Sequence, residues 1–426
     1  MMTMPDLSAD LARTRADYEA FKARGLKLDM TRGKPSPEQL SLSDAMLLPQ
    51  GNRDTTTAAG EDARNYGGNL QGLPEVRALF AEALGLPADA IALGNNSSLA
   101  LMHDCIVWAL LKGVPGSERP WSRETAPAFI CPVPGYDRHF GLAEEFGFRL
   151  LPVPLTGQGP DMDAVEALAA DPAVKGMWCV PRYSNPTGET YSDETVRRLA
   201  TMTTGAPDFR LFWDDAYAVH HLTERQTPLA AILDLAREAG HADRAFCFAS
   251  TSKVTLAGAG VALFASSPAN VAWYLARAGR RTIGSDKLNQ LRHLRFLRDA
   301  GGLRAHMDRH RVLIAPKFEA VLAALERRLG GTDLARWSRP DGGYFISVDA
   351  LPGTAARVVD LAKAAGLALT PAGATWPQGR DPDNSNLRLA PTFPALRDVE
   401  AAAEGIAICI ALAGFEQRAA EATAEA

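Results

Sequence analysis

The chain lacks several features that would place it in a membrane, secreted or nucleic-acid-binding class. No apolar run approaches the roughly 18 residues of a membrane-spanning helix, and the first residues lack a basic region followed by an apolar core. The net charge of -5 gives no general attraction for nucleic acid or anionic membranes. We therefore expect a cytoplasmic protein that acts on small molecules, with partners that are neither nucleic acid nor membrane.

Cysteine is also scarce and irregularly placed. The five cysteines are odd in number, lie mostly inside apolar runs, and show neither CxxC nor Cys/His ligand spacing. We expect buried, reduced thiols and no metal site. The positions are Cys105, Cys131, Cys179, Cys247 and Cys409.

The chain has what a large α/β core requires. Its 426 residues, 46% of them hydrophobic, can form two domains. Short β-rich runs alternate with helical stretches, and their continuous hydrophobicity predicts a mostly parallel sheet covered by helices on both faces. The predicted strands are 129–133, 148–155, 176–180, 209–213, 245–249 and 261–265.

The flanking segments predict a second, smaller domain. An amphipathic helix is expected over 7–24 and another helix over 74–84, which Pro74 begins and Gly85 ends. After about residue 303 come a long helix, a strand at 343–348, a helix near 355–365, a strand at 386–389 and a final Ala-rich helix. We expect an N-terminal segment (1–50) that joins the small domain, a large domain (51–303) and a small α+β domain (304–426).

Lys253 is the first candidate for chemistry. It follows the strand predicted at 245–249 and stands beside the small hydroxyl residues Ser250 and Ser252. Such a lysine can anchor pyridoxal 5'-phosphate (PLP) through a Schiff base, although a solvated surface lysine has the same pattern. PLP also needs an anion at its pyridine nitrogen, donors to its ring oxygen, a phosphate cradle and an aromatic group on its ring face.

Two other strand ends offer groups for the ring. Asp214 and Asp215 follow the strand 209–213, and the spacing to Tyr217 favours Asp214 for the pyridine nitrogen and Tyr217 for the ring oxygen. Asn185, after the strand 176–180, is a second donor at an edge where open α/β sheets bind ligands. The alternatives are a metal site or helix N-cap for the aspartates and an ordinary turn for Asn-Pro-Thr-Gly.

Three further segments supply the remaining functions. Ser97 and Ser98 open an apolar helix, whose free N–H groups and hydroxyls suit a phosphate, or a simple N-cap. Tyr136 follows a predicted strand and could cover the ring, unless it is a core or turn tyrosine. Arg388 is a charge within an apolar strand, which suits an amino-acid carboxylate or an internal salt bridge.

In their order along the chain and in their residues, these segments resemble the class I aminotransferases of the type I PLP fold. The resemblance covers nearly the whole chain. Three segments are most similar to a bacterial subgroup of aspartate aminotransferases. They are Thr31-Arg32-Gly33-Lys34-Pro35, Tyr66-Gly67-Gly68-Asn69, and Ser250-Thr251-Ser252-Lys253-Val254-Thr255 with Gly258-Ala259-Gly260.

The resemblance implies a role for each ring-binding candidate. Lys253 would be the Schiff-base lysine, and Asp214 would pair with the pyridine nitrogen. Asn185 and Tyr217 would hold the ring oxygen, and Tyr136 would lie on the ring. Lys253, Asp214 and Tyr217 would be the catalytic residues.

The resemblance also implies a phosphate site shared between subunits. Ser97, Ser98, Ser250 and Ser252 would bind the phosphate, and Tyr66 would reach over from the other subunit of a homodimer. The family usually carries an arginine eight residues after the lysine as the phosphate's cationic partner. This sequence has Val261 there, so another group would have to compensate the phosphate charge.

The substrate contacts are only partly indicated. By resemblance, Arg388 and Asn185 would bind the substrate, and Gly33 would let the backbone approach it closely. The cation for a dicarboxylic side chain is not ranked by spacing. Its candidates are Arg32, Lys34, Arg64, Arg138 and Lys287.

The expected activity is a ping-pong transamination from L-aspartate to 2-oxoglutarate, giving oxaloacetate and L-glutamate. The alternatives are an aminotransferase for aromatic or a broad range of amino acids, and a PLP lyase or synthase on the same fold. A PLP-binding regulator without catalysis is the remote alternative. Only about 30 residues precede the Thr-Arg-Gly-Lys segment, too few for a DNA-binding domain.

Overall fold

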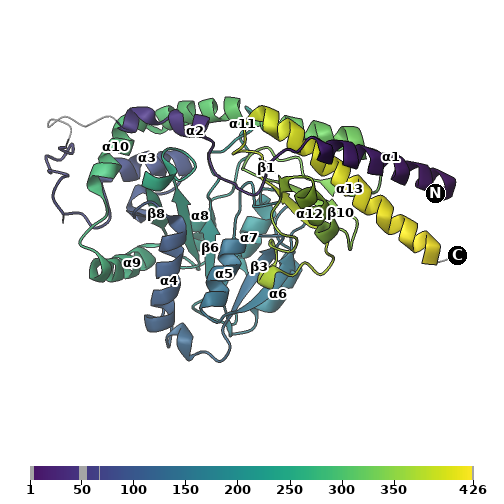
Figure 1. Ribbon diagram of the computed structural model, residues 1–426. Coiled ribbons are helices and arrows are strands. Elements are labelled where there is room, and N and C mark those ends of the chain that lie inside the picture. Colours follow the sequence, from purple (N-terminus) through teal and green to yellow (C-terminus); the bar gives the residue numbers. More distant parts are fainter. Residues whose placement is uncertain (1–3, 48–54, 67, 425–426) are drawn as a thin grey trace.

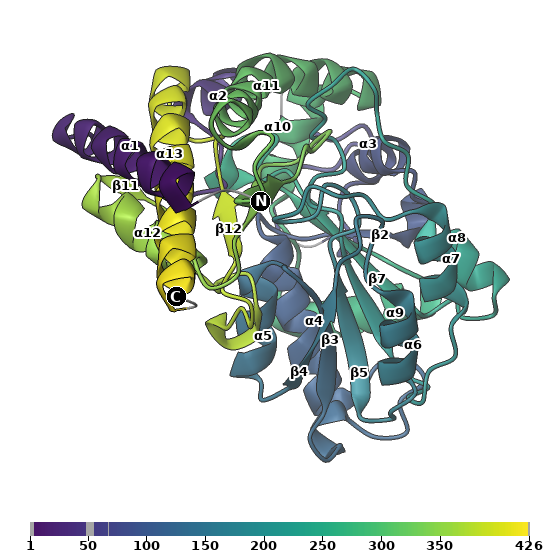
Figure 2. The same ribbon diagram turned by 90° about the vertical axis from the view of Figure 1, so that its right-hand side faces the viewer.

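A mixed sheet forms the centre of the molecule (Figures 1 and 2). The structure, a computed structural model, describes residues 4–47, 55–66 and 68–424. Within them the sheet has seven strands in the order β2-β8-β7-β6-β5-β3-β4; β8 runs antiparallel to both neighbours, and the other adjacent pairs are parallel. The strands are β2 Ile91–Leu93, β3 Ala128–Val133, β4 Arg149–Pro154, β5 Val174–Cys179, β6 Arg210–Asp214, β7 Ala245–Ser250 and β8 Ala262–Ala265.

Helices cover both faces of this sheet, which confirms the predicted α/β architecture. Alternate residues of one strand point to opposite faces, so Ala128 and Ile130 pack in one core and Phe129 and Cys131 in the other. On one face lie α4 Ser98–Lys112, α5 Asp137–Glu145 and α9 Pro268–Arg281. On the other lie α3 Pro74–Leu84, α6 Met162–Ala169, α7 Asp193–Thr201, α8 Ile232–Glu238 and α10 Lys287–Leu297.

A second group of elements packs around its own core. It contains a three-stranded antiparallel sheet and a two-stranded parallel one. Its strands are β9 Ala335–Trp337, β10 Ile346–Ala350, β12 Asn386–Leu389, β1 Leu28–Asp29 and β11 Leu367–Ala368. Its helices are α1 Met4–Ala23, α11 Ala300–Leu329, α12 Ala355–Ala364 and α13 Leu396–Ala424, and the short α2 Pro37–Ser41 packs against α11. Short 3-10 turns occur at Asp44–Leu47, Ala88–Ala90, Trp121–Arg123, Ala257–Ala259 and Pro377–Gly379.

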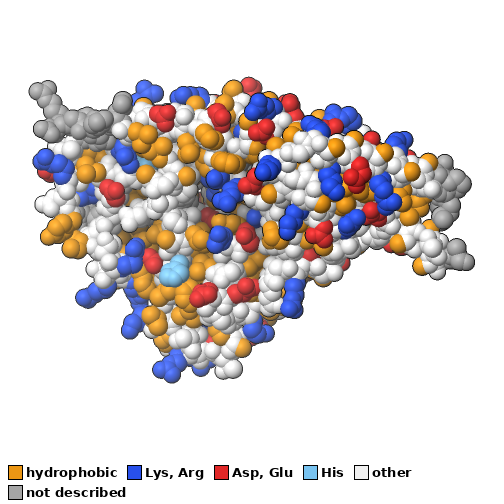
Figure 3. All heavy atoms as spheres, in the orientation of Figure 1, with side chains coloured by type: hydrophobic (Ala, Val, Ile, Leu, Met, Phe, Trp, Pro, Cys, Tyr) orange, Lys and Arg blue, Asp and Glu red, His pale blue; other side chains and the backbone are white. Residues whose placement is uncertain are grey.

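The opening helix belongs to this second core. Leu7, Tyr18 and Phe21 of α1 are buried there, and α1 lies beside α13, with both ends of the chain at the same side of the molecule (Figure 1). Charged side chains of both signs are interspersed over this end (Figure 3). Ion pairs join this region to α13: Arg15 of α1 lies 3.3 Å from Glu416, and Arg24, just after α1, lies 2.7 Å from Glu404.

Two sequence-based boundaries need comment. The strand expected at 343–348 begins only at Ile346, because Gly343 has a φ of +85°, in the left-handed region that no strand residue adopts. The domain boundary expected after residue 303 lies inside α11, whose Leu303 packs against the large sheet and whose Ile314 packs in the second core. The boundary expected after residue 50 lies outside the described residues.

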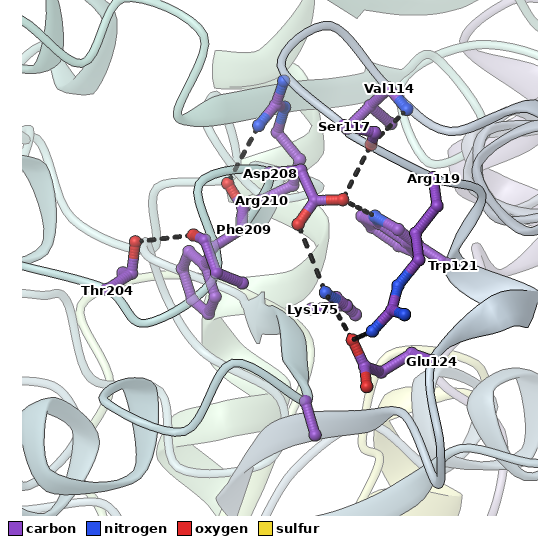
Figure 4. A network of polar contacts seen from close by, with 12 residues as sticks. Val114, Ser117, Arg119, Trp121, Glu124, Lys175, Thr204, Asp208, Phe209 and Arg210 are labelled. Atoms are coloured by element: carbon purple, nitrogen blue, oxygen red, sulfur yellow. Dashed lines mark hydrogen bonds and ion pairs between the residues drawn. The ribbon is translucent and has the colours of Figure 1, made fainter.

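A polar network fixes the amino ends of the central strands (Figure 4). Asp208, just before β6, accepts from Ser117 Oγ at 2.7 Å and from Trp121 Nε1 at 2.9 Å. Lys175 at the start of β5 lies 3.4 Å from Asp208 and 3.3 Å from Glu124. Ligands of α/β sheets bind at the carboxyl ends of the strands. These contacts lie at the opposite edge of the sheet and leave the carboxyl ends to the candidate site.

All five cysteines are buried and free. No helix within the described ranges combines the length and the apolar character needed to cross a membrane.

Candidate active site

The candidate lysine lies just beyond the carboxyl end of β7. Its ammonium nitrogen is 4.9 Å from the centre of the Tyr217 ring. Burial lowers the pKa of Lys253, and the negative charge of Asp214 partly opposes that shift. A lower pKa increases the share of neutral amine, the form that attacks a carbonyl and accepts a proton. The environment of Lys253 thus suits the Schiff-base role that the sequence predicts for it.

Asp214 and Asp215 occupy different environments at the end of β6. Asp214 is buried, with Oδ2 3.1 Å from His139 Nε2, and its Oδ1 is buried with no hydrogen-bond partner in residues 4–47, 55–66 and 68–424. Asp215 pairs with Arg182 at 3.7 Å and lines a separate cavity with Arg182 and Cys247, and its Oδ1 also has no hydrogen-bond partner among the described residues. A buried carboxylate oxygen without a donor is costly, so either oxygen suits a ligand that brings an N–H group. The surroundings distinguish the two carboxyls: the charge of Asp214 acts on Lys253, whereas Asp215 lies with Arg182. They favour Asp214, the residue proposed from the spacing.

His139 is a site residue that the sequence reasoning missed. Its ring stacks on Trp178, with centroids 4.5 Å apart and planes 10° apart, and its Nε2 faces Asp214. The clue in the sequence is its position three residues after Tyr136, one helical turn along α5. The contact with Asp214 depends on packing between β3, β5 and β6, which no local pattern reveals.

The two candidate tyrosines flank the same space. Tyr136 stands at the start of α5, half-buried, with its ring centroid 4.9 Å from that of His139. Burial, with a smaller effect of the Asp214 charge, raises the pKa of Tyr136 to about 12. Burial also raises the pKa of Tyr217 well above its usual value. Both hydroxyls therefore remain protonated and can donate hydrogen bonds at neutral pH.

The phosphate candidates converge from two segments. Ser250 Oγ donates to Ser252 Oγ at 3.0 Å, and Ser252 Oγ lies 3.0 Å from the carbonyl oxygen of Asn96. Ser97 caps α4 by accepting from Ala100 N at 3.1 Å, and Ser98 is the first residue of that helix. The N-cap interpretation of Ser97 is thus realised, and its hydroxyl hydrogen stays free to donate. Val261 is buried and apolar.

Arg388 makes the internal salt bridge that its sequence allowed. Its Nη1 donates to Asp137 Oδ1 at 2.9 Å and lies 3.5 Å from Asn185 Oδ1. Its guanidinium carbon is 5.1 Å from the centre of the Phe345 ring, and its buried Nε has no hydrogen-bond partner within the described part of the chain. The Nε proton is therefore one that a substrate carboxylate could accept, which leaves the second interpretation a prediction.

Gly33 lies against the same aromatic ring. A Cβ atom added to Gly33 would be 2.1 Å from Phe345 Cζ. The close approach expected at this glycine is therefore made to the ring that supports Arg388. A side chain at position 33 would displace that ring.

The remaining candidates lie farther from this cluster. Tyr66 is 78% exposed, and Gly67 lies outside the described residues. Of the candidate cations, Arg32 faces Asp29 at 3.7 Å, Lys34 lies 4.0 Å from the centre of the Phe393 ring, and Arg64 and Lys287 pair with Asp62 and Glu61. Arg138 stands on α5 between Asp137 and His139 and has no ion-pair partner within the described part of the chain.

Comparison with known proteins identifies the family. The family model described as aspartate aminotransferase matches residues 2–422. The chain belongs to the aspartate aminotransferase family. It is 54% identical to a putative aminotransferase of Mycolicibacterium smegmatis over 96% of each chain, and 50% identical to an aspartate aminotransferase of Corynebacterium glutamicum over 94% of this chain and 92% of that one.

A solved member of the aspartate aminotransferase family has the same fold. The crystal structure of an aspartate transaminase from Corynebacterium glutamicum superposes with a TM-score of 0.96 at 48% identity and covers 98% of each chain. This agreement confirms the predicted type I PLP-dependent transferase fold. The resemblance stated from the sequence motifs is confirmed as well.

Proposed function

We propose that this protein is a PLP-dependent aminotransferase that moves the amino group of L-aspartate to 2-oxoglutarate in two half-reactions. One observation carries the proposal: burial lowers the pKa of Lys253 against the charge of Asp214, whose Oδ1 is buried and has no hydrogen-bond partner among the residues that the structure describes. The Corynebacterium glutamicum relative at 50% identity, named an aspartate aminotransferase, supports the choice of aspartate.

The residues present fit PLP at its ring. When bound, PLP supplies an electron sink for the carbanion formed at the substrate α-carbon. Asp214 Oδ1 would accept the pyridine N–H, and His139 would orient that carboxylate. Tyr217 and Asn185 would donate to the ring oxygen, and Tyr136 would cover the ring face.

Lys253 would hold the cofactor's aldehyde carbon covalently. Its amine, once displaced by the substrate amine, would take the proton from the substrate α-carbon and return it to the cofactor side. Arg388 would bind the α-carboxylate with its Nε edge and so fix that proton within reach of Lys253. Gly33 would keep Phe345 in place beneath Arg388.

The phosphate would lie at the start of α4. The free N–H groups of this helix end, with the hydroxyls of Ser97, Ser98, Ser250 and Ser252, provide donors without a side-chain cation. These backbone amides would take the place of the arginine that Val261 replaces. The helix field adds partial positive charge at the same point.

We further propose the assembly and location that the sequence indicates. The exposed ring of Tyr66 would reach the phosphate of a second subunit, so the active form would be a homodimer with sites at the interface. The chain would divide into the three segments expected from the sequence, 1–50, 51–303 and 304–426, and act in the cytoplasm.

The half-reaction tests this function. The purified protein is loaded with PLP, and its visible spectrum is recorded before and after L-aspartate is added without any oxo acid. We expect the yellow band to convert to that of pyridoxamine phosphate, with one oxaloacetate released per site. If the yellow band persists with aspartate but converts with aromatic amino acids, the substrate is an aromatic amino acid and not aspartate. Release of ammonia, or loss of the substrate's side chain, would indicate a lyase.

A further inference from the structure

A buried polar network lies behind Lys253, on elements that the proposed chemistry does not use. Its members are Gln39 on α2, His306 and His310 on α11, Tyr344, and His220. Gln39 and Tyr344 are 0% exposed, and His310 and His220 are 1% exposed. Such groups are costly to bury unless their hydrogen bonds are satisfied.

Gln39 is the centre of the network. Its Oε1 accepts from Ser36 N at 3.1 Å, which leaves its Nε2 with two protons to donate. Nε2 lies 2.9 Å from Tyr344 Oη and 3.0 Å from His310 Nδ1. Both partners must therefore accept from Gln39, because the amide nitrogen has no lone pair to offer.

One branch of the network ends on the backbone of the lysine itself. Tyr344 Oη accepts from Gln39 and donates to the carbonyl oxygen of Lys253 at 3.3 Å. A neutral His310 that accepts at Nδ1 carries its proton on Nε2, which lies 3.1 Å from His306 Nε2. His306 Nε2 in turn lies 2.7 Å from the carbonyl oxygen of Val254, so this second branch reaches the backbone beside Lys253 through His306.

The histidines are held neutral, as this pattern requires. Burial lowers the pKa of His310 to about 3, and burial is also the main cause that lowers the pKa of His306. His220, whose pKa burial lowers to about 3, faces the carbonyl of Lys253 at 3.3 Å. The direction of the hydrogen bonds is fixed on the Tyr344 branch, which runs from Gln39 to the carbonyl of Lys253, whereas His306 Nε2 faces both His310 Nε2 and the Val254 carbonyl.

The segment at the other end of the network contains Gly33, for which a substrate contact is proposed. Gln39 follows Gly33 by six residues, and its capping box with Ser36 fixes the start of α2. Between them, Lys34 O accepts from Thr392 Oγ1 at 3.1 Å, close in the chain to Arg388. Movement of the 31–36 segment on substrate binding would therefore move the Gln39 amide.

We propose that Gln39 is a positioning residue, which couples the N-terminal segment that contains Gly33 to the backbone of Lys253 through Tyr344. This inference rests on the proposed role of Lys253. It assigns to Gln39 no contact with substrate or cofactor. Its effect is to hold the lysine backbone in one orientation once the 31–36 segment is in place.

The test compares Gln39→Leu with a matched control, Gln290→Leu. Gln290 is also 0% exposed and has two partners, Leu73 N at 2.9 Å and Ser285 Oγ at 2.6 Å, but none at Lys253. Tyr344→Phe is a second test variant, because it removes one hydroxyl with little change of shape. All three are studied as PLP-loaded full-length proteins.

Two readouts separate positioning from general loss of stability. In Gln39→Leu and Tyr344→Phe we expect kcat to fall about tenfold, with a smaller change in KM, whereas Gln290→Leu lowers Tm and leaves kcat within about twofold. Hydrogen exchange of the 251–256 peptide should slow when succinate, a dicarboxylate that cannot transaminate, binds the wild type. In Gln39→Leu succinate should slow exchange near 30–36 only.

The outcomes distinguish the two proposals. Unchanged kcat in both test variants, equal loss in Gln290→Leu, or full succinate protection of 251–256 in Gln39→Leu would each overturn the coupling. If Gln39→Leu does not fold, Tyr344→Phe decides by the same criteria. Failure of the proposed function would be visible earlier, as a wild type that carries no cofactor on Lys253.

Discussion

Asp214 and Asp215 are adjacent in the sequence, yet their carboxylates serve different faces of the sheet. Side chains alternate along a strand, so the last residue of β6 and its successor point in opposite directions. One carboxylate meets His139, and the other meets Arg182. The choice of Asp214 from its spacing to Tyr217 agrees with this geometry.

A matched pair of substitutions tests the difference. Asp214→Asn removes the charge that would keep the pyridine nitrogen protonated, and a charge-assisted hydrogen bond is worth about 1.5–3 kcal/mol, so kcat should fall roughly 10- to 100-fold. Asp215→Asn should lower Tm through the Arg182 pair and leave kcat nearly unchanged. Steady-state kinetics with both proteins gives the answer, and equal losses of kcat would refute the assignment.

At the scale of elements, Ser97 at the start of α4 has two roles: it caps the helix, and its hydroxyl is proposed to bind the phosphate. Ser97 Oγ accepts from Ala100 N, and its hydroxyl proton can still reach a phosphate. Stability and cofactor affinity are thus combined at one helix end. Substitutions that retain one task and remove the other can separate them.

Ser97→Ala and Ser97→Asp make that separation. Ser97→Ala loses the cap, which costs about 1 kcal/mol, so both Tm of the cofactor-free protein and PLP affinity should fall. Ser97→Asp keeps the cap but places a negative charge near the phosphate, so Tm should be retained while PLP affinity falls further. Thermal melts and PLP titration measure the two effects. If Ser97→Asp leaves the PLP affinity unchanged, the phosphate does not bind at this helix end.

The sequence predicts elements well where their signal is local. Continuous apolar runs identified all the long strands of the central sheet, and Pro74 and Gly85 marked the bounds of α3. Strands β2, β1 and β11 are two or three residues long and exist through pairing with distant partners, so no periodicity predicts them. The contacts of His139 with Asp214 and of Arg388 with Asp137 were missed for the same reason, since each joins segments far apart in the chain.

At the scale of the whole molecule, the buried histidines make stability depend on pH. Burial lowers the folded-state pKa of His220 and His310 to about 3 and of His293 to about 4, against about 6.5 in an unfolded chain. The unfolded state therefore binds protons that the folded state does not. Their contribution is complete above pH 6.5 and is lost as pH falls toward 4.

We expect the free energy of unfolding of the cofactor-free protein to decrease between pH 7 and pH 5. The slope is at most roughly 1.4 kcal/mol per pH unit for each such histidine. Denaturant titration at several pH values measures it, and His310→Gln should give a shallower slope. Constant stability over this range would contradict the neutral, buried state of these rings.

The proposed dimer makes a prediction about mixed subunits. If Tyr66 completes the site of its partner, a subunit with Lys253→Ala and a subunit with Tyr66→Ala form a hybrid with one site defective in both residues and one site intact. Activity should therefore return when the two inactive or weakened proteins are unfolded together and refolded. If each Tyr66 serves its own subunit, mixing restores nothing.

The central claim is that Lys253 carries the cofactor, and one measurement tests it directly. The PLP-loaded protein is reduced with borohydride, digested, and mapped by mass spectrometry for the phosphopyridoxyl group. We predict the group on Lys253 alone, with the buried Lys287 unmodified as the internal control. A phosphopyridoxyl group on a different lysine, or on none, would contradict the account.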